Sequence, residues 1–263
     1  MNKIITLATS VAAGVLLAGC YSTTGPGRVL DGEWRGQIAP GNHIEIKGVI
    51  GNVRASYTAG NQVVVTWTKR GRDDDPTLVD VVAVEQGSGV TVCAVYPDVP
   101  GRAPNACGPG AEGHMATDNN DVEVTFTVVV PVGVEFVGQT VTGNVDANDV
   151  RSNVVATTVT GNVHITTSGY AAATTVTGNV DVSIGLPDWP HDLDFTAVTG
   201  NVSVEVPSNT NADVRLTTVS GNITTDFALA APAPGHRDGP IGSGGRLLTL
   251  TTVSGNIALR RGA

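Results

Sequence analysis

The chain has 263 residues, of which 41% are hydrophobic and 15% are charged, and 24 acidic side chains outnumber 15 Lys and Arg. The basic residues form no run, so this balance argues against a nucleic-acid partner and against charge-driven binding to anionic lipid. The length is sufficient for one elongated domain with a sizeable core.

The first residues have the features of an export signal. Lys3 precedes a mostly apolar run, Ile4 to Leu17, which is shorter than the ~20 residues that a membrane-spanning helix needs. Leu17-Ala18-Gly19-Cys20 resembles the lipobox of bacterial lipoproteins. This resemblance implies a signal peptide over residues 1–19 and lipid attached to Cys20; the alternative is a plain signal peptide with an incidental cysteine. Tyr21 after the cysteine favours the outer membrane, by analogy with other lipoproteins, with the domain facing the periplasm or the cell surface.

Residues 20–40 are rich in Gly, Ser, Thr and Pro, which predicts a flexible tether, and the folded domain is expected over 41–263. Apolar and polar residues then alternate in short segments, which is typical of β-strands. The segments are 43–46, 52–57, 62–67, 78–84, 89–95 and 121–130. Ala59-Gly60-Asn61 is predicted as a turn between the second and third of them. Long loops are expected at 70–76 and 96–120.

Cys93 and Cys107 remain after the signal peptide. An exported chain meets an oxidising compartment, so the sequence predicts a disulfide between them. Free thiols and a metal-binding pair are the alternatives. Neither is favoured, because no CxxC motif or neighbouring His pair accompanies the two cysteines.

From residue 134 onward one phrase recurs. Thr-Val-Thr-Gly-Asn-Val and close variants appear six times, and a fainter copy ends at Asn52-Val53. The six Gly-Asn pairs are Gly143-Asn144, Gly161-Asn162, Gly178-Asn179, Gly200-Asn201, Gly221-Asn222 and Gly255-Asn256. Successive Asn residues lie 18, 17, 22, 21 and 34 positions apart. Such a period with β-branched residues predicts an all-β, single-domain β-solenoid of stacked ~17–22-residue coils, preceded by a β-strand region.

The phrase itself explains the coil. Thr and Val favour a pleated strand, whereas Gly and Asn tolerate positive φ and allow a sharp corner. If each coil stacks on the last, the Asn side chains form a ladder of amide hydrogen bonds and the residue after each Asn fills the interior. The expected inward residues are Val145, Val163, Val180, Val202, Ile223, Ile257, Val182, Ile184, Val204, Val206 and Leu259. Thr218 and Thr252 are predicted to point inward with Val219 and Val253 outward, but the phase of the earlier copies stays open.

The order of these motifs carries a family resemblance. An opening Gly-Asn-Val strand, a Val-Val-Val-Thr-Trp-Thr-Lys-Arg-Gly segment, a Val-Val-Val-Pro-Val-Gly segment and the serial Gly-Asn copies follow one another over residues 40–262. The chain is similar to the DUF4097 family, the bacterial "putative adhesin" β-strand-repeat proteins. The resemblance implies a β-solenoid and no catalytic residues. Family members usually carry Asp where this chain has Asn, so repeated metal binding at the corners is not expected.

Three groups of residues are candidates for chemistry. Asp188, Asp192 and Asp194 accompany Trp189 and His191, which suits either a polysaccharide-cleaving site or a solvated loop whose Trp covers the coil edge. Asp73-Asp74-Asp75 could hold Ca²⁺ but lacks the EF-hand spacing, which favours a polar turn. The five histidines, His43, His114, His164, His191 and His236, are far apart, which favours surface positions over a metal or catalytic set.

The sequence therefore predicts a non-enzymatic, lipid-anchored envelope protein without cofactor or metal, acting as an adhesin-like or scaffold surface. Its expected contacts are the membrane through Cys20 and envelope glycans or envelope proteins, through flat Thr-rich faces. A polysaccharide-active β-helix enzyme and an envelope-stress sensor remain the alternatives.

Overall fold

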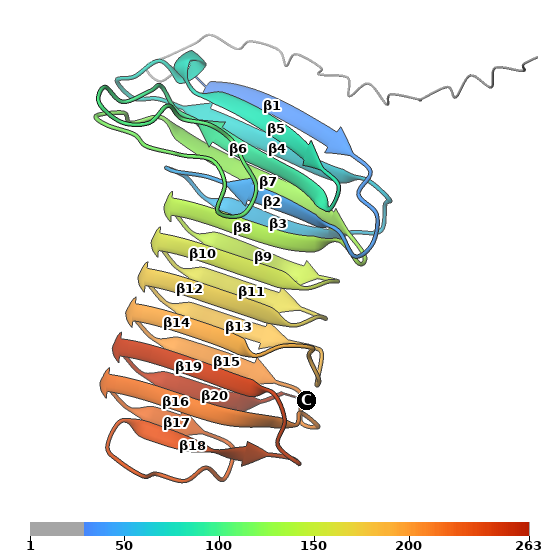
Figure 1. Cartoon of the computed structure of the whole chain (residues 1–263), viewed down its shortest axis with the longest axis vertical. Coiled ribbons are helices and arrows are strands. Elements are labelled where there is room, and N and C mark those ends of the chain that lie inside the picture. Colours follow the sequence, from blue (N-terminus) through green and yellow to red (C-terminus); the bar gives the residue numbers. More distant parts are fainter. Residues whose placement is uncertain (1–28, 263) are drawn as a thin grey trace, which may run out of the picture.

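A computed structural model describes residues 29–262, so the predicted signal peptide and Cys20 lie outside the described residues. The described chain is all β except for one short 3-10 helix, η1 (Pro76–Leu78). Its strands form two ten-stranded sheets that face each other and stack along the long axis of the molecule (Figure 1).

Sheet A contains, in spatial order, β1 (Val29–Gly36), β4 (Val63–Arg70), β7 (Glu123–Pro131), β3 (Val53–Thr58), β9 (Val145–Val150), β11 (Val163–Thr167), β13 (Val180–Ile184), β15 (Val202–Val206), β20 (Ile257–Arg261) and β17 (Ile223–Thr225). Sheet B contains β18 (His236–Ile241), β16 (Ala212–Ser220), β19 (Leu247–Ser254), β14 (Leu193–Thr199), β12 (Ala171–Thr177), β10 (Val154–Thr160), β8 (Glu135–Thr142), β2 (His43–Lys47), β6 (Gly89–Val95) and β5 (Asp80–Gln86).

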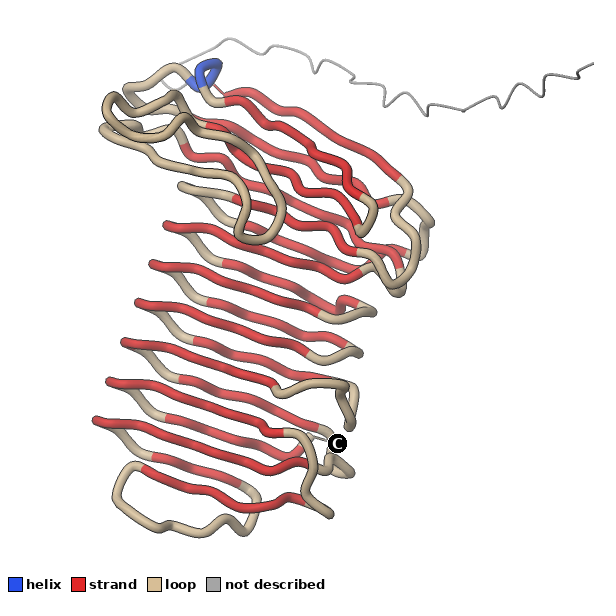
Figure 2. Tube along the Cα trace, viewed as in Figure 1, coloured by secondary structure: helices blue, strands red, loops and turns tan. Residues whose placement is uncertain are grey.

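A strand of sheet B followed through a Gly-Asn corner by a strand of sheet A forms one coil, for example β10 with β11. Neighbouring coils pair through parallel ladders in both sheets, as in β10–β12 and β11–β13. The ends differ, because β1–β4, β4–β7, β5–β6 and β16–β18 pair antiparallel. The rungs of this regular stack are visible along the trace in Figure 2. The architecture is thus all-β and β-solenoid-like, as the repeats predict.

The corners explain why each copy carries Gly. Gly161 has φ 155°, and an added Cβ there would collide with the backbone carbonyl of Gly143 in the neighbouring coil. The same relationship joins Gly178 to Gly161 and Gly200 to Gly178. Stacking at β-sheet spacing therefore leaves no room for a side chain at this position.

The predicted interior is largely confirmed. All the expected inward residues are buried except Ile223, which is half-buried because β17 lies at the edge of sheet A. The open question of phase is also resolved. Thr140, Thr158, Thr175, Thr218 and Thr252 are buried, and the Val that follows each of them is exposed.

Three sequence expectations need correction. Residues 29–36 are not tether but strand β1, paired with β4 over its full length. In this strand Asp31, Glu33 and Arg35 alternate with inward positions. Two of those positions are glycines, so the sequence lacks the apolar alternation that would signal a strand. The repeated phrase predicts no strand of its own between the last two copies, yet β18 lies there. Finally, the copies do not stack in chain order, since β19 and β20 lie between earlier coils.

Candidate functional site

The outer face of sheet B carries a regular surface. On each coil strand a Thr and the Val two residues later point away from the core, and the threonines lie in register on adjacent strands. We call this surface the Thr–Val array. It comprises Thr157 and Val159, Thr174 and Val176, Thr196 and Val198, Thr251 and Val253, and Thr217 and Val219. Gln139 and Val141 continue it on β8.

The array contains no charged residue and is accessible. Its six valines are 41% to 78% exposed, although all of them occupy β-strands of a ten-stranded sheet. The hydroxyls of Thr157, Thr174 and Thr251 make no hydrogen bond within the described residues, whereas Thr196 donates to Asp194 and Thr217 contacts His236. Strand geometry sets the lattice, with about 4.8 Å between strands and about 6.6 Å between Thr and Val along a strand. Hydroxyls, three of them free, and methyl groups therefore alternate on a repeating grid.

The outer face of sheet A is different, because it carries charges. Arg54 approaches Asp146 at 3.8 Å, and the His164 ring nitrogen lies 3.4 Å from Asp181. Glu205 lies opposite Arg260 in the ladder. The two faces of the stack thus offer distinct surfaces. The Thr and Val positions of the array are uncharged on every strand, although Asp194 and Arg215 lie beside them on β14 and β16.

A buried polar cluster holds the long loop 96–120 against sheet B. The Glu45 carboxylate accepts hydrogen bonds from Thr91 at 2.8 Å, Gln139 at 3.0 Å and the Gly110 N–H at 3.0 Å. Lys47 Nζ donates to the carbonyls of Gly108 and Gly110 at 2.6 Å. The alternation of residues 43–46 predicts Glu45 as an outward residue, and nothing in the sequence signals that a loop covers it. The Glu45 carboxylate and the Lys47 ammonium group therefore hold the loop in place.

The predicted disulfide is confirmed. Cys93 on β6 is bonded to Cys107 in the loop, with 5.6 Å between the Cα atoms. The same loop is tied down at Tyr96, whose hydroxyl donates to the Val122 carbonyl at 2.6 Å and whose burial raises its pKa. A disulfide of this kind indicates an extracytoplasmic protein.

The side chains of the acidic loop before β14 are held by contacts with the rest of the protein. Trp189 is buried against the core, as the reading of a Trp that covers the coil edge predicts. Asp192 accepts a hydrogen bond from the Leu247 N–H at 3.0 Å, and Asp194 accepts one from Thr196. The two carboxylates on which a glycan-cleaving site would depend are therefore bonded to the protein itself.

The aspartates before Pro76 form a turn. Asp121 accepts the N–H groups of Arg72, Asp73 and Asp74 at 3.2, 2.9 and 3.1 Å. Asp75 caps η1 by accepting from the Thr77 N–H. Within residues 29–262 no group of three or more His, Cys, Asp or Glu is placed to hold a metal ion.

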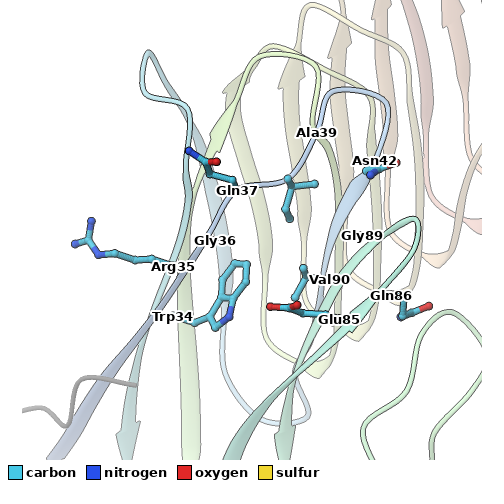
Figure 3. Close-up of a pocket in the computed structure, with 11 residues that line it drawn as sticks. Trp34, Arg35, Gly36, Gln37, Ala39, Asn42, Glu85, Gln86, Gly89 and Val90 are labelled. Carbon is cyan, nitrogen blue, oxygen red and sulfur yellow. The ribbon is translucent and has the colours of Figure 1, made fainter. Parts of the chain in front are cut away.

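One hollow lies at the N-terminal end of the stack, with a volume of about 580 Å³. It is lined on one side by Trp34 and Gln37 and on the other by Glu85, Gln86 and Val90 (Figure 3). It forms where β1 extends sheet A beyond β5, the last strand of sheet B at that end. No residue singled out from the sequence lines it.

No helix among the described residues is long and apolar enough to cross a bilayer.

The sequence matches the family described as Toastrack DUF4097 over residues 114–260. The chain belongs to the toastrack DUF4097 family. The matched region begins in the loop before β7 and includes every coil that carries the Thr–Val array. A comparison with curated proteins finds no match.

Three solved structures that match the chain are bacterial proteins of low sequence identity to it. A "putative cell adhesion protein" from Clostridium sporogenes is 8% identical, with TM-score 0.47, covering 88% of the toastrack chain and 100% of its own. A "putative adhesin" from Bacteroides fragilis is 12% identical, with TM-score 0.31 and coverages of 89% and 97%. A "putative lipid binding protein" from Parabacteroides distasonis is 9% identical, with TM-score 0.29 and the same coverages. At these values the likenesses carry no functional argument.

Proposed function

We propose that this chain is a non-enzymatic, lipid-anchored protein of the bacterial envelope that acts as an adhesin-like or scaffold surface, with the Thr–Val array as its contact face. The array is the observation that carries this proposal. It combines exposed methyl groups with threonine hydroxyls on a fixed grid, and none of its residues is charged. The hydroxyls of Thr157, Thr174 and Thr251 make no hydrogen bond within the described residues. A glycan strand presents the same two kinds of group, hydroxyls and C–H faces, at regular intervals.

Each contact of this kind is weak, so binding depends on number. Repetition of the same pair on successive coils allows several sugar units to be held at once, and linked weak contacts add to a useful avidity. A rigid stack favours this mode, because no ordering of the protein is needed on binding. The coils are proposed to repeat every ~17–22 residues within a single domain, which keeps the grid uniform except where loops interrupt it.

The proposed anchor is lipid on Cys20, with the domain held at the outer membrane. It is supported by the lipobox-like Leu17-Ala18-Gly19-Cys20 and by the disulfide, which suits an oxidising compartment. Fractionation tests it. The native chain is expected to sediment with membranes and Cys20→Ser to be released, and equal sedimentation of both would contradict the anchor.

Retention on isolated peptidoglycan sacculi tests the contact face. Thr157→Lys with Thr174→Lys places two charges in the array. The matched control, Ser183→Lys with Ser203→Lys, adds the same charges to the outer face of sheet A in neighbouring coils. We expect the array variant to lose retention at least ~10-fold, since a buried, unpaired charge costs more than ~1.4 kcal/mol, and the control to match the native chain. Equal retention of both variants, or none by the native chain, would overturn the proposal.

A further inference from the structure

The hollow at the N-terminal end of the stack opens into the space between the two sheets. β1 extends sheet A beyond β5, so no strand of the described chain lies opposite the inner face of β1. Trp34 on that face is only half-buried. On β5, Ala83 and Glu85 are opposite Val92 and Val90 of β6, whose side chains belong to the core. Ala83 and Glu85 therefore occupy inner positions, yet both are exposed, which leaves this end of the interior accessible.

Gly36 determines how the Trp34 ring lies. Residues two apart on a strand point to the same face, so Gly36 and Trp34 share the inner face of β1. A Cβ added at Gly36 would overlap the outer carbons of the Trp34 ring. The missing side chain thus lets the ring lie close against its own strand instead of filling the hollow. The volume of about 580 Å³ is in the range of pockets that hold small ligands.

Polar groups that line the hollow have no partner in the described part of the protein. Figure 3 shows the Glu85 carboxylate extending toward the Trp34 ring. Neither this carboxylate nor the indole N–H makes a hydrogen bond or an ion pair there. The side-chain amides of Gln37 and Asn42, which also line the hollow, make none either. Donors and acceptors on both walls are therefore available to a ligand.

The charge of the hollow limits the class of ligand. Glu85 and Arg35 are the charged residues that line it. The Arg35 guanidinium donates to Glu33 at 2.8 Å, and Figure 3 shows its side chain directed away from the hollow. One negative charge, that of Glu85, thus remains inside, and it repels an anionic ligand.

The unbonded groups of Trp34 and Glu85 narrow the chemistry further. An indole N–H can only donate and a carboxylate can only accept. A hydroxyl group suits both, because it accepts from Trp34 and donates to Glu85, whereas an ammonium group has no acceptor. The Trp34 ring in addition offers an apolar surface. The hollow therefore suits a neutral, flat ligand with hydroxyl groups on its rim and C–H groups on its face.

We propose that the hollow binds one neutral pyranose unit of a glycan. One C–H face of the sugar packs on the Trp34 ring, and its hydroxyls bond to Glu85 and to the amides of Gln37 and Asn42. This site lies between the sheets at the end of the stack, whereas the Thr–Val array is on the outer face of sheet B. Binding in the hollow thus goes beyond the proposed contact face and does not depend on it.

Binding of soluble sugars to the full-length chain tests the site. The probes are the methyl β-glycosides of glucose, galactose and N-acetylglucosamine, with n-butylammonium as a cationic probe. The indole N–H signals of the 3 Trp residues report binding by NMR, and Trp34→Phe identifies the Trp34 signal. We expect at least one glycoside to shift the Trp34 signal saturably, while the signal of the buried Trp189 stays unchanged. No shift with any glycoside, or tighter binding of n-butylammonium, would overturn the proposal.

Two substitutions locate the bound sugar. Gly36→Ala pushes the Trp34 ring into the hollow and Glu85→Gln removes the charged acceptor, and each is expected to weaken glycoside binding at least ~10-fold. The matched controls are Gly87→Ala, where an added Cβ meets nothing within 4 Å, and Glu112→Gln, at an exposed position of the loop 96–120. Both controls are expected to bind like the native chain. Glu85 is exposed, so Glu85→Gln tests the site even if Gly36→Ala does not fold, and native affinity of Glu85→Gln would overturn the proposal.

A charge directed inward at a sheet edge also prevents edge-to-edge association, and this role of Glu85 is measured separately. Self-association of Glu85→Gln together with native glycoside affinity would assign that role to Glu85 and overturn the sugar contact. The array variant Thr157→Lys/Thr174→Lys is expected to bind the soluble glycosides like the native chain. Failure of the array and failure of the hollow are therefore distinguishable.

Discussion

Thr158 and Gly143 are joined across two coils, because the Thr158 hydroxyl donates to the Gly143 carbonyl at 2.9 Å. The same bond links Thr140 to Gly51, Thr175 to Gly161, Thr252 to Gly200 and Thr218 to Gly255. Each of these threonines is buried and each bond satisfies a hydroxyl in the interior. In the coil of β14 the position is Ala197, so the Gly178 carbonyl receives no such bond.

Ala197→Thr is therefore expected to stabilise the protein. The new hydroxyl would face the Gly178 carbonyl as Thr175 faces Gly161, contributing about 1 kcal/mol and raising Tm by about 2–4 °C. Thermal unfolding measures the effect, with Ala197→Val as a control of similar volume that has no hydroxyl. Stabilisation by Val equal to that by Thr would show that filling space, and not the hydrogen bond, is responsible.

An interior valine and an array valine lie only four positions apart in the sequence. Val180 is 1% exposed and Val176 is 43% exposed. Val180→Asp buries an unpaired charge between the sheets and is expected to lower the free energy of unfolding by several kcal/mol. Val176→Asp, on the array, is expected to change it by less than about 0.5 kcal/mol. Denaturant unfolding of the two variants decides, and similar losses for both would contradict the assignment of inner and outer faces.

How far the sequence predicts this structure depends on the kind of contact. Alternation at Val214, Leu216, Leu248 and Leu250 correctly predicts that Thr218 and Thr252 point inward, since burial enforces the period of two. The order of the coils could not be predicted, because every Gly-Asn copy offers the same ladder and Asn256 can bond to Asn201 as well as to its nearest predecessor.

The N-terminal strands show the same limit. The turn at Ala59–Asn61 joins β3 to β4, yet β7 lies between these strands in sheet A. That neighbour comes from more than fifty residues later in the chain, and no local signal announces it. The array could not be predicted either, because its position depends on which residues of the early copies point outward. Only the packing of Thr158 and Thr175 against the core resolves this.

The Asn ladder differs in detail from the amide ladder that the repeats predict. Asn179 donates its backbone N–H to Asn162 Oδ1 at 2.8 Å and accepts the Asn201 N–H on its own Oδ1 at 2.9 Å. The bond that recurs is thus backbone N–H to side-chain oxygen. A side-chain amide donor occurs in addition at Asn179, at 3.3 Å.

Asn179→Asp is therefore expected to be milder than Asn179→Ala. Aspartate retains the oxygen that accepts the Asn201 N–H, whereas alanine leaves that donor without its partner and is expected to cost about 1 kcal/mol. The midpoints of denaturant unfolding at neutral pH give the comparison. Equal losses for Asp and Ala would mean that the side-chain oxygen does not support the corner.

Asp121 predicts a dependence on pH in the turn at residues 72–74. Backbone hydrogen bonds, chiefly from Asp73, hold the pKa of Asp121 below its usual range. A carboxyl whose pKa is lower in the folded state stabilises that state above its unfolded-state pKa of about 3.9. This contribution is lost as the pH falls through the folded-state pKa, so the turn is expected to loosen below about pH 4.

Amide hydrogen exchange of Asp73 and Asp74 measures the loosening. Native protein is expected to lose protection at these amides on going from pH 5 to below pH 3, after correction for the intrinsic exchange rate, whereas Asp121→Asn starts with weaker protection and changes little. Asp118→Asn, at an exposed position of the same loop, should follow the native profile. Protection in the native chain that does not change with pH would show that the Asp121 carboxylate does not hold the turn.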